Sequence, residues 1–223
     1  MIFGGREREL ATLNVALAED RRVLIYGSFG MGRSSLVRRF AELHKARYLF
    51  ARTSMKDGSH RACRKLFDAF VSSLPVSRRP RVSPIRFGQC RAELLGLCTR
   101  HQGQILVLLD DLCRASSPVR ILIQDLIRVE TLRLVVIPDP SLPERDRSRL
   151  EAWLYPLCRL ELRRLGRTES ETFFRLVAEQ ACQTFSDAEL RAMRDRSGGY
   201  PLLMMQEARL HLSFPHNRAP EGS

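Results

Sequence analysis

The glycine-rich run of this chain reads Gly27-Ser28-Phe29-Gly30-Met31-Gly32-Arg33-Ser34-Ser35. The residues before it, 22–26 (RVLIY), are mostly apolar or β-branched, which is typical of a buried strand. The residues after it place Leu36, Val37 and Phe40 on one face of a predicted helix. A strand, a glycine-rich turn and a helix are therefore expected in this order.

The rest of the first 165 residues continues an alternation of strands and helices. Residues 105–109 (ILVLL) form a continuous apolar run, which predicts a central parallel strand buried on both faces. Further strands are expected over 47–51, 132–137 and 158–162, and helices over 7–18, 60–74, 86–102, 117–127 and 143–154. Such alternation predicts an α/β fold with a five-stranded parallel sheet flanked by helices.

The pattern changes to helices alone after residue 165. Two helix starts are marked by capping boxes, in which Thr168 and Ser186 are each followed three residues later by glutamate. A glycine pair at 198–199 precedes a third predicted helix. We therefore expect an α/β domain over 1–165, a small helical subdomain over 166–212 and a flexible tail over 213–223.

The composition narrows the class of protein. The 223 residues are 44% hydrophobic and 28% charged, which excludes a disordered chain. The six cysteines include no C-x-x-C pair, which excludes a disulfide scaffold and a zinc site. The N-terminus lacks the apolar core of a signal peptide, and no apolar run is long enough to span a membrane. We expect a cytoplasmic protein without membrane contact.

The charge of the chain is strongly positive, with a formal net charge of +12. The lysines are Lys45, Lys56 and Lys65 alone, so nearly every basic residue is an arginine. This surplus favours a polyanionic partner, because phosphates are attracted to such a surface over about a Debye length. The alternative is a basic composition that is general to the genome and implies no partner.

The glycine-rich run matches the phosphate-binding pattern G-x-x-x-x-G-K-[ST], except that Arg33 stands in the lysine position. Glycines allow backbone N–H groups to wrap phosphate oxygens, and the following helix points its positive end at them. We expect Arg33 to reach the β- and γ-phosphates of ATP and the Ser34 hydroxyl to bind Mg²⁺. The alternative is an ordinary glycine-rich turn between a strand and a helix.

Two carboxylates follow the predicted central strand directly, Asp110 and Asp111. A phosphate-binding loop needs a carboxylate at the tip of a neighbouring strand, to hold the metal and to order the attacking water. We assign Asp110 to Mg²⁺ through its water shell and Asp111 to the nucleophilic water. The alternative is an acidic turn after a core strand.

Together these motifs resemble the P-loop ATPases of the AAA+ and STAND groups, which include archaeal-type ATPases and origin-recognition initiators. Residues 3–10 resemble the F-x-G-R-E-x-E-L box of these proteins, and residues 108–112 (LLDDL) resemble the Walker B motif of the STAND branch. Residues 198–203 (GGYPLL) resemble the Gly-x-Pro element of the helical lid. The resemblance covers residues 2 to 212 and implies a P-loop fold in which 166–212 form the lid.

The resemblance also implies roles for residues outside the loop. It places Gly5 and Arg6 near the adenine and Pro201 close to the nucleotide. Asp139 takes the sensor position at the tip of the fourth strand. Arg149 takes the position of an arginine finger, which stabilises transition-state charge in a neighbouring subunit. The alternative for Arg149 is a solvated basic face of its helix.

This chain departs from the family pattern at Arg33 and in the lid. The guanidinium is a wide planar fork, which does not replace an ammonium group at a tight phosphate site. Hydrolysis is then slow or absent while binding survives. Drift in a chain nearly devoid of lysine is the alternative explanation. The lid lacks the sensor arginine that initiators carry near the glycine turn.

Basic residues cluster after the second predicted strand, in a region that faces the central pore of ring-forming AAA+ ATPases. There they would contact the DNA backbone without sequence preference and with a steep salt dependence. A solvated basic face is the alternative. The residues are Lys56, Arg61, Arg64, Lys65, Arg78, Arg79 and Arg81.

The first functional hypothesis is an AAA+ protein that binds ATP, forms a homo-oligomeric ring or filament and assembles on DNA. Transposition regulators and initiators are similar in size and charge. The alternative is a STAND-type nucleotide switch, which binds ATP or ADP and acts on a partner protein. A third hypothesis is a degenerate ATPase subunit whose partner supplies catalysis.

Overall fold

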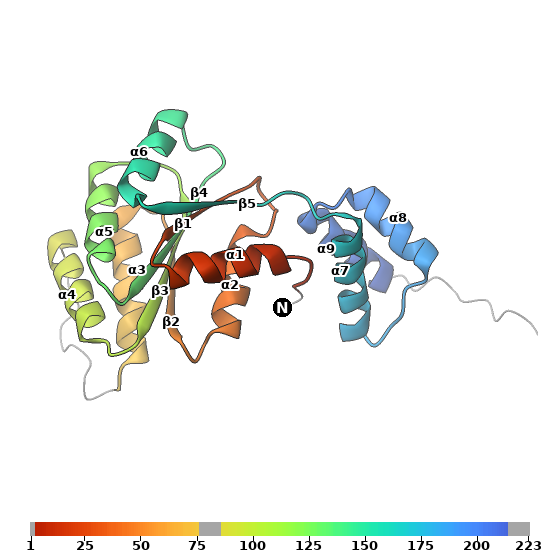
Figure 1. The fold of residues 1–223 in the computed structure, drawn as a ribbon, viewed down its shortest axis with the longest axis horizontal. Helices are drawn as coiled ribbons and strands as arrows, with labels where there is room; N and C mark the ends of the chain where they lie inside the picture. The colour runs from red at the N-terminus through yellow and green to blue at the C-terminus, as the bar shows by residue number, and fades with distance from the viewer. Residues whose placement is uncertain (1–2, 76–85, 214–223) are drawn as a thin grey trace, which may run out of the picture.

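The computed structural model describes residues 3–75 and 86–213, and a single parallel sheet organises them (Figure 1). The strand order is β2-β3-β4-β1-β5. Every pairing between neighbouring strands is parallel. The strands are β1 Arg22–Tyr26, β2 Tyr48–Ser54, β3 Gln104–Leu112, β4 Leu132–Pro138 and β5 Leu157–Glu161.

Helices cover both faces of this sheet, and a further group of helices follows it. The helices are α1 Glu7–Ala18, α2 Arg33–Leu43, α3 Gly58–Ser73, α4 Phe87–Arg100, α5 Ser117–Ile127, α6 Glu144–Leu154, α7 Arg167–Gln180, α8 Asp187–Ser197 and α9 Pro201–Ser213. The predicted α/β fold, with its five-stranded parallel sheet and a helical C-terminal part, is confirmed. No helix within 3–75 and 86–213 is long and apolar enough to cross a membrane.

The side chains of β3 alternate between two hydrophobic cores. Ile105, Val107 and Leu109 pack with α3, α4 and α5, whereas Leu106 and Leu108 pack with α1 and α2. All five are fully buried. Burial of each such side chain contributes roughly 1.5–3 kcal/mol, so this strand anchors both layers.

Two strands extend further than the sequence predicts, and both extensions lie at the carboxyl edge of the sheet. β2 continues past residue 51 to Ser54, and each of its residues pairs with one of Gln104–Asp110. β3 continues through its two aspartates to Leu112, with an irregularity in its pairing to β4 between Leu109 and Leu112. Polar residues are tolerated there because the backbone pairing continues beyond the apolar core.

One predicted capping box is wrong and the other is confirmed. α7 begins at Arg167 and its N-cap is Gly166, two residues before the expected cap Thr168, and Gly166 N donates to the Glu169 carboxylate at 2.7 Å. The box that starts at Ser186 forms as predicted, with its amide donating to Glu189 at 2.6 Å and Glu189 N donating to its hydroxyl at 3.3 Å.

The C-terminal helices α7, α8 and α9 form a group at one end of the molecule (Figure 1) and share their own apolar core. Phe174, Met193 and Met204 are buried in it, one from each helix. The segment between β5 and α7, which we call the strand linker, contacts this group at Leu165. The Leu165 amide donates to the Gly199 carbonyl at 2.8 Å. The turn between α8 and α9 is therefore fixed against the chain that leaves the sheet.

Gly199 has a φ of +70°, and a Cβ added there would lie 2.1 Å from the Leu165 carbonyl oxygen. We expect Gly199→Ala to lower the free energy of unfolding by about 2 kcal/mol or more, since the left-handed conformation alone costs ~1–2 kcal/mol. Chemical denaturation measures the change.

Gly88→Ala is the matched control, because a Cβ at this position in α4 meets nothing within 4 Å. We expect the free energy of unfolding of this variant to stay within ~1 kcal/mol of the wild-type value. Equal stability of Gly199→Ala and the wild type would contradict the proposed role of the turn.

Candidate functional site

A cavity of about 430 Å³ opens between the glycine-rich loop and the C-terminal helices. One wall is apolar and comes from the N-terminal segment, α7 and α9, with Phe3, Phe173, Pro201, Leu202 and Met205. The other wall is polar and comes from the loop, α2 and the ends of two strands, with Gly30, Gly32, Arg33, Ser34, Ser35, Arg38, Arg52 and Asp111. The cavity therefore suits a molecule with an apolar end and a polar end.

The glycine-rich loop approaches α9 closely and delivers the chain into α2. A Cβ added at Gly30, where φ is +80°, would lie 2.9 Å from Leu202 Cβ. Gly32 caps α2 in the left-handed conformation, without a side-chain hydrogen bond to the first turn and without an acidic residue in that turn. An uncapped helix N-terminus of this kind presents backbone N–H groups and a partial positive charge to the cavity.

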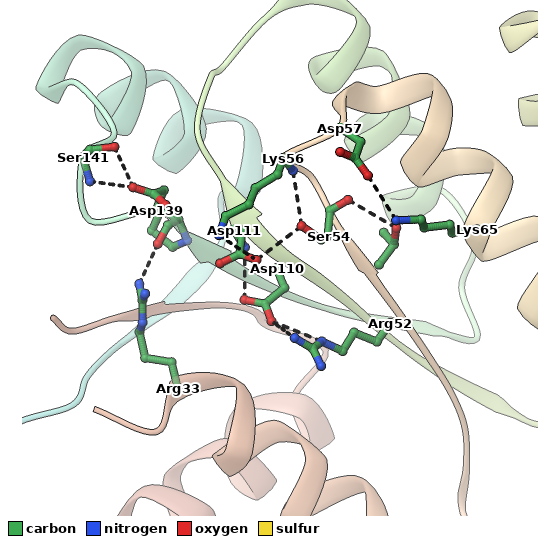
Figure 2. A network of polar contacts seen from close by, with 12 residues as sticks. Arg33, Arg52, Ser54, Lys56, Asp57, Lys65, Asp110, Asp111, Asp139 and Ser141 are labelled. Atoms are coloured by element: carbon green, nitrogen blue, oxygen red, sulfur yellow. Dashed lines mark hydrogen bonds and ion pairs between the residues drawn. The ribbon is translucent and has the colours of Figure 1, made fainter. Parts of the chain in front are cut away.

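Arg33 is buried beneath the loop, with 8% of its surface exposed. Its Nη1 donates to the Pro138 carbonyl oxygen at 2.7 Å, so the side chain reaches the carboxyl end of β4 (Figure 2). The backbone at Gly27 lies over it, since a Cβ there would be 3.6 Å from Arg33 Cδ. One N–H of the guanidinium is thus committed to the protein, and the others are available to an anion.

Asp110 is almost fully buried, and both of its carboxylate oxygens accept hydrogen bonds from the protein. Oδ2 accepts hydrogen bonds from Arg52 Nη2 at 2.6 Å and Nε at 3.2 Å. Oδ1 accepts from the amide of Asp111 at 3.0 Å. Figure 2 shows the Arg52 side chain crossing from β2 to this carboxylate. The guanidinium satisfies a charge that burial would otherwise penalise heavily.

Asp111 faces the cavity from an irregular point of β3. Its φ is +56°, a left-handed conformation that aspartate tolerates better than most residues. Ser54 Oγ donates to its carboxylate at 3.3 Å, and Lys56 Nζ lies 3.8 Å from it. At this irregularity two consecutive carboxylates lie in different surroundings: Asp110 is buried and paired with Arg52, and Asp111 is on the cavity wall.

Asp139 follows β4 directly and belongs to a neighbouring hollow that Arg33 also borders. Its Oδ1 accepts from the Ser141 hydroxyl at 2.6 Å and from the Ser141 amide at 2.9 Å. These two hydrogen bonds lower the pKa of Asp139, and the charges of Lys56 and Arg33 lower it further. The carboxylate of Asp139 therefore stays ionised at pH values below those at which an ordinary aspartate becomes protonated.

Arg6 lies at the cavity but its guanidinium is tied to the protein. It is 5% exposed and donates to the Arg163 carbonyl at 2.6 Å, with a longer contact of 3.4 Å to the Met31 carbonyl. Glu9 pairs with it at 2.6 Å. Gly5 beside it has a φ of +76° and packs against Glu169 of α7. Arg6 therefore joins the N-terminal box to the glycine-rich loop and to the strand linker.

Of the remaining predicted residues, Pro201 lines the cavity and Arg149 does not. Arg149 is half exposed on α6, 3.6 Å from Asp146. The basic residues after β2 each have an acidic neighbour: Lys56–Asp111, Arg61–Asp57, Arg64–Asp68 and Lys65–Asp57. Arg78, Arg79 and Arg81 lie outside the described residues.

Sequence reasoning missed Arg52 and Ser54, which contact the two aspartates. The signal that could have found them is strand length, because β3 pairs with β2 along Gln104–Asp110 and requires a partner of equal length. A strand that ends at residue 51 leaves this edge unpaired.

Comparison with known proteins gives a family and a fold. The model of the AAA ATPase domain family matches residues 3–137. The ORC1 protein of Aeropyrum pernix, solved in complex with DNA, superposes with a TM-score of 0.72 at 17% identity, over 99% of this chain and 62% of that one. A Walker-type ATPase of Pyrococcus abyssi gives a TM-score of 0.66 at 15% identity, over 96% and 69%. No curated protein matches the chain by sequence.

DnaA of Aquifex aeolicus, solved with AMPPCP bound, gives a TM-score of 0.58 at 15% identity and covers 95% of this chain. The chain spans 62% of the length of this DnaA and of the Aeropyrum protein. At these identities the structures establish the fold, whereas the family rests on the domain model. Because that model matches more than half of the residues, the chain belongs to the AAA ATPase domain family.

Proposed function

We propose that this chain is an AAA+ ATP-binding protein and that the 430 Å³ cavity is its nucleotide site. The observation that carries the proposal is the division of the cavity into an apolar wall and a wall formed by the uncapped N-terminus of α2. Phosphates fit the second wall, because the N–H groups of the glycine-rich loop and α2 point there. An adenine ring fits the first wall, between Phe3 and Leu202.

The proposed roles follow from the positions of the residues around the cavity. The loop from Gly27 to Ser35 holds the phosphates, and α7–α9 act as a lid whose Pro201 approaches the nucleotide. Gly5 and Arg6 position the base, since their segment packs against α7. The AMPPCP bound to DnaA supports a nucleotide in this fold.

Hydrolysis at this site is proposed to be slow. Asp111 is placed to orient the attacking water, because it is the carboxylate on the cavity wall. Asp139 is ionised nearby and serves as a sensor that reports on Arg33. The anchoring of Arg33 to the Pro138 carbonyl limits its reach toward the γ-phosphate. Arg149 is exposed on α6 and is available to a neighbouring subunit as a finger, which makes turnover depend on oligomerisation.

Assembly on DNA is the proposed biological output. The DNA complex of the Aeropyrum protein supports this choice. Arg61 and Lys65 of the basic cluster after β2 are exposed, and their acidic neighbour Asp57 weakens their field while the net charge of the chain is +12. A STAND-type switch that binds ATP or ADP and acts on a partner protein is the second candidate, favoured by the engagement of Asp110 and Arg33, since a switch needs no rapid turnover.

The first test is ATP binding by Gly30→Ala. The new Cβ meets Leu202 at 2.9 Å and pushes the loop away from α9. We expect ATP affinity to fall roughly tenfold, which corresponds to ~1.4 kcal/mol. Titration calorimetry measures the affinity.

Gly58→Ala is the matched control, because its φ of +86° imposes the same backbone strain in open space. We expect its ATP affinity to equal that of the wild type. A wild-type protein that binds no ATP overturns the proposed function. Equal affinities in both variants would place the nucleotide elsewhere.

The second test is Arg33→Lys, which restores the usual motif. A slender ammonium gives up the Pro138 contact and reaches the γ-phosphate, so we expect turnover to rise about tenfold, which is ~1.4 kcal/mol in barrier height. Phosphate release under saturating ATP measures the rate. Arg39→Lys on the exposed side of α2 is the control and is expected to leave turnover unchanged. Rapid wild-type hydrolysis that the substitution does not alter would show that Arg33 is no impediment.

The third test is the salt dependence of duplex DNA binding in the presence of ATP, followed by fluorescence anisotropy. We expect Arg61→Gln to weaken binding and to reduce the slope of log K against log salt by about 0.9, the value for one phosphate contact. Arg128→Gln removes an equally exposed charge at the end of α5 and is expected to bind as the wild type does. Absence of wild-type binding at low salt refutes the DNA proposal.

A further inference from the structure

The buried carboxylate of Asp110, at the carboxyl end of β3, is paired with a cationic side chain of the protein. Asp110 Oδ2 receives two N–H groups of Arg52, and the side chain of the aspartate is 2% exposed. The register explains this contact, because Ser54 pairs with Asp110 and Arg52 lies two residues earlier on the same side of β2. The guanidinium therefore reaches diagonally across the strand pair to the carboxylate.

The residues around Asp110 do not fit a hydrated magnesium ion as they are arranged. The sequence-based hypothesis gives this carboxylate a role through the water shell of Mg²⁺, which requires an oxygen that faces those waters. Both oxygens have protein partners instead, Arg52 on one and the Asp111 amide on the other. A hydrated metal ion beside Asp110 would lie close to the Arg52 guanidinium, and the repulsion between the two cations opposes that arrangement.

Arg52 also belongs to the cavity in which we propose that ATP binds. It lines that cavity together with Arg33 and Arg38, and its side chain is 39% exposed. The hydrogen bonds to Asp110 use Nε and Nη2 and leave Nη1 for another acceptor. Arginine suits this double role, because its planar fork binds carboxylate and phosphate oxygens alike.

We propose that Arg52 supplies the positive charge between Asp110 and the nucleotide phosphates, so that this site binds ATP without a divalent cation. The Arg52 guanidinium lies between the carboxylate and the phosphates, and Arg33 and Arg38 neutralise the remaining phosphate charge. This inference rests on the proposed nucleotide site. The inference predicts how ATP binding depends on a divalent cation, whereas the proposed function predicts only that ATP binds.

The experiment is a titration of the protein with ATP in excess EDTA and again in excess MgCl₂. We expect the two wild-type affinities to agree within about threefold, which is ~0.7 kcal/mol. Arg52→Gln removes the charge, and its affinity in EDTA is expected to fall at least tenfold below its affinity in MgCl₂. Arg52→Lys keeps the charge without the fork and is expected to lie between the two.

Arg47→Gln is the matched control, since Arg47 precedes the same strand at its opposite end and contacts Gln104 instead of the cavity. It is expected to behave as the wild type in both titrations. Because Arg52→Gln leaves Asp110 buried without a partner, the double variant Arg52→Gln/Asp110→Asn removes both charges, and thermal unfolding verifies that each protein is folded. Weak binding of this double variant in EDTA is the expected result.

The outcomes separate this inference from the function on which it rests. Wild-type binding that requires MgCl₂ overturns the role of Arg52 and leaves the nucleotide site standing. No wild-type binding in either titration overturns the nucleotide site itself. Strong binding of the folded double variant in EDTA also refutes the role of Arg52.

Discussion

The burial of β3 on both faces is the constraint from which the site follows. Residues 105–109 contribute side chains to two cores in alternation, so a polar group along them would be buried without a partner. The polar side chains of β3 therefore occur at its two ends, Gln104 at the start and Asp110 and Asp111 at the carboxyl end. Because the neighbouring strands run parallel to it, the ends of β1, β2 and β4 lie at the same edge. The candidate site lies at this edge, where the charged residues of β3 are.

A second constraint is the close approach of backbone segments around the cavity. Gly30 lies against Leu202, and Gly199 lies against the Leu165 carbonyl, so each junction has room for a hydrogen atom and not for a Cβ. Arg6 adds hydrogen bonds from the N-terminal segment to the linker and the loop. The loop, the linker and α9 are thereby coupled, and a ligand that moves one of them acts on the others. We propose this coupling as the physical basis on which the lid would respond to nucleotide.

Much of this arrangement can be predicted from local patterns in the sequence. The bounds of α1 and β1 agree with the predicted bounds, because apolar spacing and a glycine-rich turn mark them. The partner of Asp110 cannot be found in this way. Arg52 lies at a polar strand end that only pairing with β3 prolongs, and its contact with Asp110 spans 58 residues. The cap of α7 is also ambiguous in the sequence, because Gly166 and Thr168 are each followed three residues later by a glutamate. The spacing alone does not decide between these two starts.

Because lysine is scarce, the cations of the site are arginines, and each of them is held by protein acceptors. A guanidinium has several N–H donors in one plane and needs more than one acceptor to satisfy them when it is buried. Arg33 uses the Pro138 carbonyl, Arg6 uses two carbonyls and Glu9, and Arg52 uses Asp110. Each cation is therefore fixed by protein acceptors before any anion arrives. Because these cations need little rearrangement to meet an anion, they would favour the binding of phosphates at the proposed nucleotide site.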